Sequence, residues 1–276
     1  MTTATQLGYM RLQDILTAPF GSGQLSVGLL TKKWRRTDPA PHCLREVRIQ
    51  GSNDALFVDL TGTGPLVPST SSVARASALF AANPGSGDAM GFFAEFDFGH
   101  MVSRFQGNVN LGLLVLAAFH DFKDGSARSN FFSREFFYST EDSDSEPPPE
   151  KADKAIRRQQ LDTSSLQGVW RNTNANSSGI VTIEIRDRGQ ELGIRAHGVG
   201  EAGRVDWGEV QGRSYGKDCF SAEAMAFSAT FSSRGIRCHL QANVKQGVLV
   251  VAYFTEFQDG SGRSNYFSRE FYYKEA

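Results

Sequence analysis

The chain has 276 residues, of which 40% are hydrophobic and 21% charged, so it is long enough to fold into two domains with separate cores. Its formal net charge of −1 gives no overall attraction to nucleic acid or to anionic membrane, and neither is expected as a partner. No apolar run approaches the roughly 20 residues of a membrane-spanning helix, so we expect a soluble protein.

The cysteines and the N-terminus indicate a cellular compartment. The three cysteines (Cys43, Cys219 and Cys238) are an odd number without paired metal-ligand spacing, which favours reduced thiols. Reduced thiols are typical of the cytoplasm. Residues 1–9 lack a basic stretch followed by an apolar one, which argues against a signal peptide. We therefore expect a cytoplasmic protein.

The N-terminal segment, residues 1–23, has a short run of apolar residues at helix-like spacing. The run ends at Pro19 and Gly21. A lone helix of this length is marginal in water, so we expect it to pack on the domain that follows.

Two long segments of the chain repeat each other. Residues 124–138 recur as residues 259–273 with three substitutions, and the match extends upstream at an offset of about 135 residues. Roughly half the positions agree between 89–138 and 224–273. The chain is therefore a tandem duplication of units of about 110 residues, a normal domain size.

The first repeat, 24–139, departs from the second after Gly64. Prolines at 65 and 68 stand where the second repeat has Asp206, Trp207 and Glu209, and proline is poor strand material. The linker, 140–161, is acidic and contains three consecutive prolines, which predicts a solvated, semi-stiff connection. Its last part, 151–161, has good helix propensity.

The second repeat, 162–276, has the clearer strand pattern. Apolar and polar residues alternate in short runs separated by Gly, Asn and Asp, which predicts strands at 168–171, 180–186, 192–196, 205–210, 224–231, 236–244, 248–257 and 265–273. Such a set forms a sandwich or an up-and-down barrel, and a barrel of eight strands leaves no exposed edge. We expect an all-β protein of two tandem eight-stranded antiparallel up-and-down barrels after a short N-terminal helical segment.

A tryptophan near the start of each repeat has an arginine as its expected partner in the last strand, Trp34 with Arg134 and Trp170 with Arg269. First and last strands are neighbours in a closed barrel, so each guanidinium is expected over the indole, a contact worth about 0.5–2 kcal/mol. We interpret all four residues as closing the barrels.

This layout resembles the calycin superfamily of lipocalin-like, avidin-like and fatty-acid-binding barrels. The resemblance rests on Gly168-Val169-Trp170, which opens the first strand, and on Arg269 late in the domain; the first repeat has Lys32 in place of the glycine. It implies a barrel whose interior binds a small ligand.

The duplicated loop Asp-Gly-Ser-x-Arg-Ser-Asn is a second candidate site. Its residues favour turns, and Asp124 with Arg128, or Asp259 with Arg263, can pair across the loop. A structural hairpin is the simpler interpretation. The functional one is a polar site for a sugar or another hydroxyl-rich ligand, to which Asn130 and Asn265 also belong.

Two further candidate sites lie where the repeats differ. Trp207 and Glu209 are two residues apart, so we expect them on one face of a strand, where they suit a ligand with an apolar ring and a donor group. The alternative is that Trp207 is core and Glu209 faces an arginine. The catalytic candidates are His120, Asp121 and Glu209.

Signals of standard catalysis are absent. The histidines show no zinc-binding spacing, and there is no phosphate-binding glycine loop or serine nucleophile motif, so no metal and no cofactor are expected.

The favoured function is binding of a small, largely apolar or aromatic ligand inside a barrel. Two alternatives stay open: a cofactor-free isomerase or cyclase acting on a hydrophobic biosynthetic intermediate, and lectin-like carbohydrate binding through the two loops, which gives avidity. The partner is a small molecule in each case, and the oligomeric state is left open.

Overall fold

The computed structural model describes residues 24–38, 44–52, 55–62, 72–140, 160–189, 191–200, 203–233 and 235–275. These residues form strands and connecting turns and no helix, which confirms the predicted all-β class. The N-terminal segment, Pro65, Pro68 and most of the linker lie outside the described residues, so the helices predicted in the N-terminal segment and the linker stay predictions.

Each repeat contributes eight strands to a continuous hydrogen-bonded network. The first repeat holds β1 (Lys33–Arg36), β2 (Leu44–Ser52), β3 (Ala55–Gly62), β4 (Ser72–Ala81), β5 (Ala89–Asp97), β6 (Met101–Asn110), β7 (Leu113–Phe122) and β8 (Phe131–Ser139). The second holds β9 (Gly168–Asn172), β10 (Ile180–Asp187), β11 (Leu192–Gly200), β12 (Gly203–Gly216), β13 (Ala224–Ser233), β14 (Ile236–Lys245), β15 (Val248–Phe257) and β16 (Tyr266–Lys274). All eight strands expected in the second repeat are present.

Strand pairing within each repeat is antiparallel, follows chain order and is cyclic. Every strand pairs with the next, and the last returns to the first, β8 to β1 and β16 to β9. The alternation seen in the sequence sets which face is inside: in β10, Ile183 and Ile185 are buried while Glu184 between them is not.

Two separate cores fill the insides of the two cycles. The first contains Trp34, Phe92 and Phe137, and the second contains Trp170, Phe227 and Tyr272. Apolar side chains meet from all sides of each cycle, so each repeat buries its own core.

A turn before the first strand of each repeat covers one end of its core. In the first repeat the buried Leu30 lies on this turn, and its carbonyl accepts a hydrogen bond from Trp34 Nε1 at 3.1 Å. In the second, Leu166 accepts from Trp170 Nε1 at 2.8 Å. The tryptophan that marks each repeat in the sequence thus ties the turn to the first strand.

The cation over each tryptophan is a lysine, which corrects the predicted tryptophan–arginine pairs. Lys32 Nζ lies 5.7 Å from the Trp34 ring centre, and Lys274 Nζ lies 5.7 Å from that of Trp170. Gly168 makes room for Lys274, because a Cβ there would stand 2.9 Å from Lys274 Cε. Gly168 also has a φ of +121°, a backbone conformation that favours glycine, and this accounts for the glycine of the Gly-x-Trp motif.

Arg134 and Arg269 lie elsewhere because of strand register. Trp34 is opposite Ser139 and Trp170 is opposite Lys274, five residues beyond each arginine. Both arginines point out of their own repeat and toward the other one: Arg269 donates to Asn108 Oδ1 of the first repeat at 3.2 Å.

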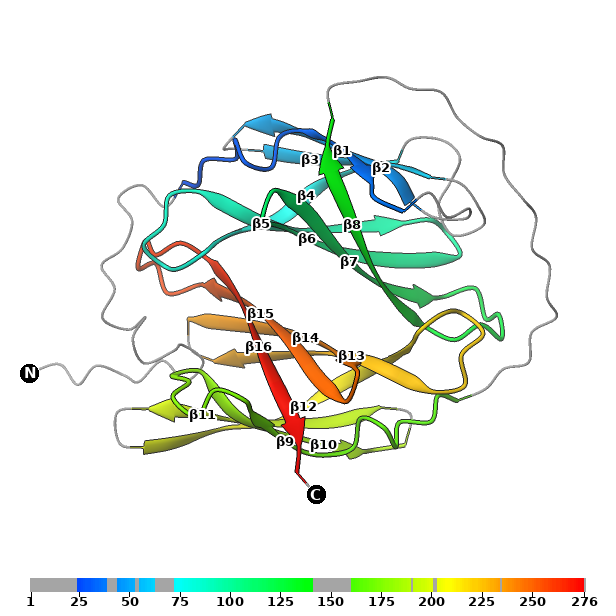
Figure 1. Ribbon diagram of the computed structural model, residues 1–276, viewed down its shortest axis with the longest axis vertical. Helices are drawn as coiled ribbons and strands as arrows, with labels where there is room; N and C mark the ends of the chain where they lie inside the picture. The colour runs from blue at the N-terminus through cyan, green and yellow to red at the C-terminus, as the bar shows by residue number, and fades with distance from the viewer. Residues whose placement is uncertain are drawn as a thin grey trace, which may run out of the picture.

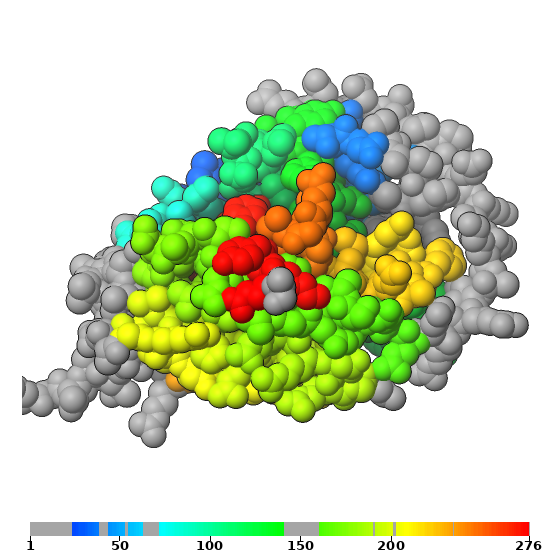
Figure 2. Space-filling model, turned by 60° about the horizontal axis from the view of Figure 1, so that its bottom comes forward, coloured from blue at the N-terminus to red at the C-terminus, as the bar shows by residue number. Residues whose placement is uncertain are grey.

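The two repeats pack against each other through contacts that come in equivalent pairs (Figure 1). β8 pairs with β12 at Phe131 and Gly216, and β16 pairs with β4 at Tyr266 and Ala81. Two aromatic clusters accompany these bridges, one of Phe119, Phe132 and Tyr215 and one of Phe80, Phe254 and Phe267. From below, the second repeat presents a continuous surface with the red C-terminal strand at its centre (Figure 2).

Candidate functional site

The duplicated loop adopts the same hydrogen-bonded structure in both repeats. Arg128 donates to Asp124 at 2.5 Å and lies 4.0 Å from the Phe122 ring centre. Arg263 donates to Asp259 at 2.7 Å and lies 4.5 Å from the Phe257 ring centre. The predicted ion pairs across both loops are confirmed.

Local hydrogen bonds hold the carboxylate of this loop ionised. Bonds from Ser126, and then from Arg128, lower the pKa of Asp124 to about 2. Serine and arginine bonds likewise lower the pKa of Asp259 against the effect of its partial burial. Asn130 and Asn265 close the loops by accepting from the backbone N–H groups of Phe122 at 3.0 Å and Phe257 at 2.9 Å.

Each loop also attaches its repeat to the other one. Ser129 Oγ donates to the carbonyl of Ser221 at 3.0 Å, and Ser264 Oγ donates to that of Ser86 at 2.9 Å. The carbonyls of Asn130 and Asn265 accept backbone bonds from Gly216 and Ala81. The loop therefore has a structural role between the repeats, which is one reason for both copies to keep it.

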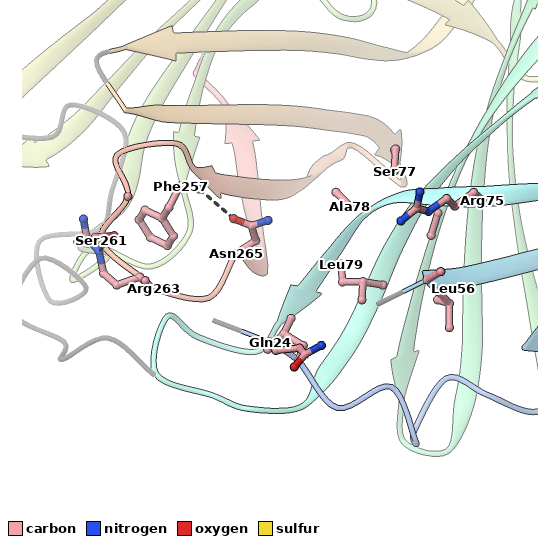
Figure 3. A pocket seen from close by; sticks show the side chains of 15 residues that line it. Gln24, Leu56, Arg75, Ser77, Ala78, Leu79, Phe257, Ser261, Arg263 and Asn265 are labelled. Atoms are coloured by element: carbon pink, nitrogen blue, oxygen red, sulfur yellow. Dashed lines mark hydrogen bonds between the residues drawn. The ribbon is translucent and has the colours of Figure 1, made fainter. Parts of the chain in front are cut away.

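Two open clefts lie beside these loops, in equivalent places. The first has a volume of about 600 Å³ and runs between the loop of the second repeat and β4 of the first (Figure 3). The second, of about 840 Å³, runs between the loop of the first repeat and β12. Ser261, Arg263 and Asn265 face one cleft, and Ser126, Arg128 and Asn130 face the other. Four of the predicted loop residues, Arg128, Asn130, Arg263 and Asn265, thus line polar clefts, whereas Asp124 and Asp259 do not.

The opposite walls of the clefts differ between the two sites. Arg75, Ser77 and Leu79 of β4 line the first cleft, in view in Figure 3. Arg213 and Ser214 of β12 line the second, which Glu191 also borders. The shared loop and the unlike walls make two related but unequal sites.

Trp207 and Glu209 do not share a face, which corrects the predicted pair. In the pairing of β11 with β12, Arg195 is opposite Glu209 and His197 is opposite Asp206, so β12 has a bulge at Trp207 and Gly208. Trp207 is buried and packs against Phe231, with ring centres 5.7 Å apart.

Glu209 points outward and is held by arginines. It accepts from Arg188 at 2.6 and 3.0 Å, and Arg186 lies 4.0 Å away.

Gly198 leaves the space that the indole of Trp207 fills, since a Cβ there would lie 2.7 Å from Trp207 Nε1. Core packing for Trp207 and an arginine partner for Glu209 match the alternative stated from the sequence.

Near Trp207 the second repeat contains a partly buried carboxylate, Glu270, that the sequence analysis did not single out. It accepts hydrogen bonds from Asn172 at 2.7 Å, Ser177 at 2.9 Å, and Tyr253 and Tyr272 at 3.0 Å each. Burial, above all, raises the pKa of both tyrosines, so their hydroxyls stay protonated and donate. The alternation of the last strand, which places Glu270 inside, was the available signal.

The space next to Glu270 is small. A cavity of about 10 Å³ lies among Trp207, Cys238, Tyr253 and Glu270, which is about the size needed for one water molecule. Burial raises the pKa of the Cys238 thiol to about 12, so it remains protonated. In this conformation the cavity is too small for an organic ligand.

His120 and Asp121 point to opposite faces of β7. His120 is buried inside the first repeat between Ser103, 2.7 Å from its Nδ1, and Ser133, 3.3 Å from its Nε2. Burial lowers its pKa to about 3, so it is neutral. Asp121 faces the second repeat, where Arg213 lies 3.0 Å away and Arg104 is also in contact. The two catalytic candidates therefore belong to different environments and do not act together.

Comparison with known proteins identifies no family for this chain. No protein-family model matches the chain, and no curated protein matches its sequence. The described part of the chain has no group of His, Cys, Asp and Glu side chains arranged to hold a metal ion. Within the same residues, no helix is long and apolar enough to cross a membrane.

Proposed function

We propose that the chain binds a hydroxyl-rich, carbohydrate-like ligand in the two polar clefts between its repeats. The observation that supports this proposal is the placement of the same loop, in two copies, along the two large clefts. A conserved loop geometry with serine, arginine and asparagine side chains offers repeated donors and acceptors to a polyol. Two sites in one chain provide avidity for a ligand with repeated units.

The chemistry of the loops suits a neutral polar ligand. Their carboxylates are already paired with arginine in the same loop, so the net charge presented by each loop is close to zero. Hydroxyl groups can bond to Arg128 and Arg263, which line the clefts, without separating these ion pairs, since a guanidinium group has five N–H donors.

The test is a glycan array followed by calorimetric titration of the best-binding oligosaccharide. We expect two sites per chain in the unmodified protein. Ser126→Trp and Ser261→Trp stand at equivalent positions and each fills one cleft, so each is expected to remove one site, and the double variant both. Trp207→Ala is the control and leaves both clefts intact. Absence of any glycan binding, or stoichiometry that ignores both substitutions, rejects the proposal.

A second proposal concerns the insides of the repeats. We infer that each cyclic set of eight strands is an up-and-down barrel of the lipocalin- or avidin-like type, as the calycin resemblance implies. A small apolar or aromatic ligand, or the substrate of a cofactor-free isomerase or cyclase, is then expected beneath Trp207. The supporting observation is the carboxylate of Glu270 with its two tyrosines beside the cavity.

Such a ligand requires Trp207 to swing out, because the cavity has only about 10 Å³. Native mass spectrometry of the purified protein and of Trp207→Ala separates the two proposals. Retention of a small apolar molecule by the unmodified chain supports the interior site. Retention in neither protein, together with glycan binding, leaves the clefts as the site.

A further inference from the structure

At the centre of the junction two arginines face the opposite repeat without a carboxylate between them. Arg134 of β8 and Arg269 of β16 occupy equivalent positions on the outward faces of the last strands. Among the described residues, neither arginine forms an ion pair, and the Nε atoms of both are buried without a hydrogen-bond partner.

The neighbouring acids cannot neutralise this pair. Glu135 and Glu270 follow the arginines in sequence and therefore point inside, where Arg36 and the tyrosine cluster engage them. Asp121, the carboxylate on the outward face of β7, forms ion pairs with Arg104 and Arg213.

The charge of Arg269 acts on the guanidinium group of Arg134. Burial, and then the charge of Arg269, lower the pKa of Arg134 to about 10, and burial lowers the pKa of Arg269. Both side chains remain protonated at neutral pH, so two like charges share a partly desolvated space. Burying two like charges without a counterion raises the free energy of the folded chain, and an anion bound between them lowers it.

Polar amides line the same region. Arg269 donates to Asn108 Oδ1, but the equivalent bond from Arg134 to Asn243 is not formed, and Asn243 Oδ1 is buried without a partner. Gln106 Nε2 and Gln241 Oε1, two residues before Asn108 on β6 and Asn243 on β14, are also buried and unpaired among the described residues. Both glutamines lie on the floor of a groove of about 470 Å³ that opens between the repeats.

We propose that Arg134 and Arg269 form a binding site for a phosphate- or sulfate-type oxyanion that bridges the two repeats. Arginine forks match the geometry of such oxyanions, and one from each repeat allows a single anion to join both. Gln106 Nε2 is a further unpaired donor near the two arginines. This site is distinct from the clefts beside the duplicated loops.

Thermal unfolding in phosphate at constant ionic strength tests the proposal. Saturable binding to the folded chain is expected to raise Tm by about 2–4 °C for each tenfold increase in phosphate above Kd. Sulfate is expected to act likewise, whereas chloride and acetate are not. Arg134→Gln with Arg269→Gln is expected to abolish the increase, and to leave Tm in chloride unchanged or higher because the like charges are gone.

Arg237→Gln is the matched control, since Arg237 is an exposed arginine that lines the groove beside Gln106 and Gln241 and is paired with Glu256. It is expected to keep the phosphate response. Proton–nitrogen NMR of the unmodified protein gives a second measurement that needs no variant: two arginine Nε–H resonances are expected to shift with phosphate. A phosphate response equal to that of chloride, a response retained by the double variant, or unshifted arginine resonances overturns the proposal.

Discussion

Both repeats have a glutamate at the same inward-facing position of the last strand, but the partners of its carboxylate differ. Glu135 of the first repeat has Arg36 at 3.7 Å, and its pKa is raised by burial against the opposing effect of that arginine. Glu270 of the second repeat is surrounded by four hydrogen-bond donors. The position of Arg36 is taken by Asn172 in the second repeat, so a cation has been exchanged for a neutral donor.

A second position differs in the same way. His120 of the first repeat, neutral and bonded to two serines, is replaced by Thr255 in the second, which bonds to Cys238 at 3.9 Å. The comparison teaches that a duplicated β fold keeps its backbone and apolar core while the buried polar groups change together. Such groups form networks in which each partner must be satisfied, so one substitution demands another.

The largest expected effect comes from Glu270→Gln. The carboxamide replaces an oxygen that accepts from Asn172, Tyr253 or Tyr272 with a donor, so buried donors lose their acceptor, and we expect a loss of about 3 kcal/mol in the free energy of unfolding. Glu135→Gln is the matched control, for which about 1 kcal/mol is expected because burial already favours its neutral form. Urea denaturation measures both. Equal losses would show that the two glutamates are satisfied equivalently.

The next largest effect concerns the acid sensitivity of His120, inside the first repeat. The pKa of His120 is about 3 in the folded chain and about 6.5 unfolded, so its contribution to stability is complete above pH 6.5 and is lost as the pH falls toward 3. Between pH 6.5 and 4.5 this amounts to about 2–3 kcal/mol.

His120→Gln keeps polar groups near Ser103 and Ser133 but does not titrate. His239, whose pKa burial lowers to about 4, remains in the variant, so we expect the pH slope of stability to fall by about half. Denaturation curves at several pH values measure this slope. An unchanged slope contradicts the assignment of acid sensitivity to His120.

Exchanging one aromatic residue between the repeats tests the hydrogen bonds around Glu270, with a smaller expected effect. Tyr272→Phe copies Phe137 of the first repeat and removes a hydroxyl donor that lies within hydrogen-bond distance of two acceptors, the Ile180 carbonyl at 2.9 Å and Glu270 at 3.0 Å, so a loss of about 1–2 kcal/mol is expected. The reverse change, Phe137→Tyr, places a hydroxyl in an apolar core and is also expected to destabilise. Thermal denaturation of both variants checks this; neutrality of either exchange shows interchangeable interiors.

The smallest effect concerns the lysines over the tryptophans. Lys32 precedes β1, whereas Lys274 lies in β16, so the repeats use different parts of the chain for one contact. Lys32→Met and Lys274→Met are each expected to cost about 0.5–1 kcal/mol and to shift tryptophan emission. Arg269→Met should leave the emission of Trp170 unchanged. A shift caused by Arg269→Met instead would restore the arginine pairing.

Much of the fold follows from local pattern. The duplication, the all-β class and the eight strands of the second repeat are present in the periodicity of the sequence, because a half-buried strand needs alternating residues. The ion pairs of the two loops were also predictable, since Asp and Arg are only four residues apart in a turn.

Other expectations failed where more than one strand decides the outcome. The bulge at Gly208 places Trp207 and Glu209 on opposite faces of β12, and a bulge depends on the pairing with the neighbouring strand. The arginines were assigned to the tryptophans because the register of β1 with β8 and of β9 with β16 was unknown, and a shift of five residues separates them.

By itself the sequence determined the repeat, the strand positions and the inner and outer faces of most strands, because these depend on residues close together in the chain. Only the tertiary structure decided which side chains meet: the donors around Glu270, the arginines at the junction and the loops that join the repeats. Apart from the two tyrosines near Glu270, these contacts connect residues about 90 to 180 positions apart, and strand register and the packing of one repeat on the other set their distances.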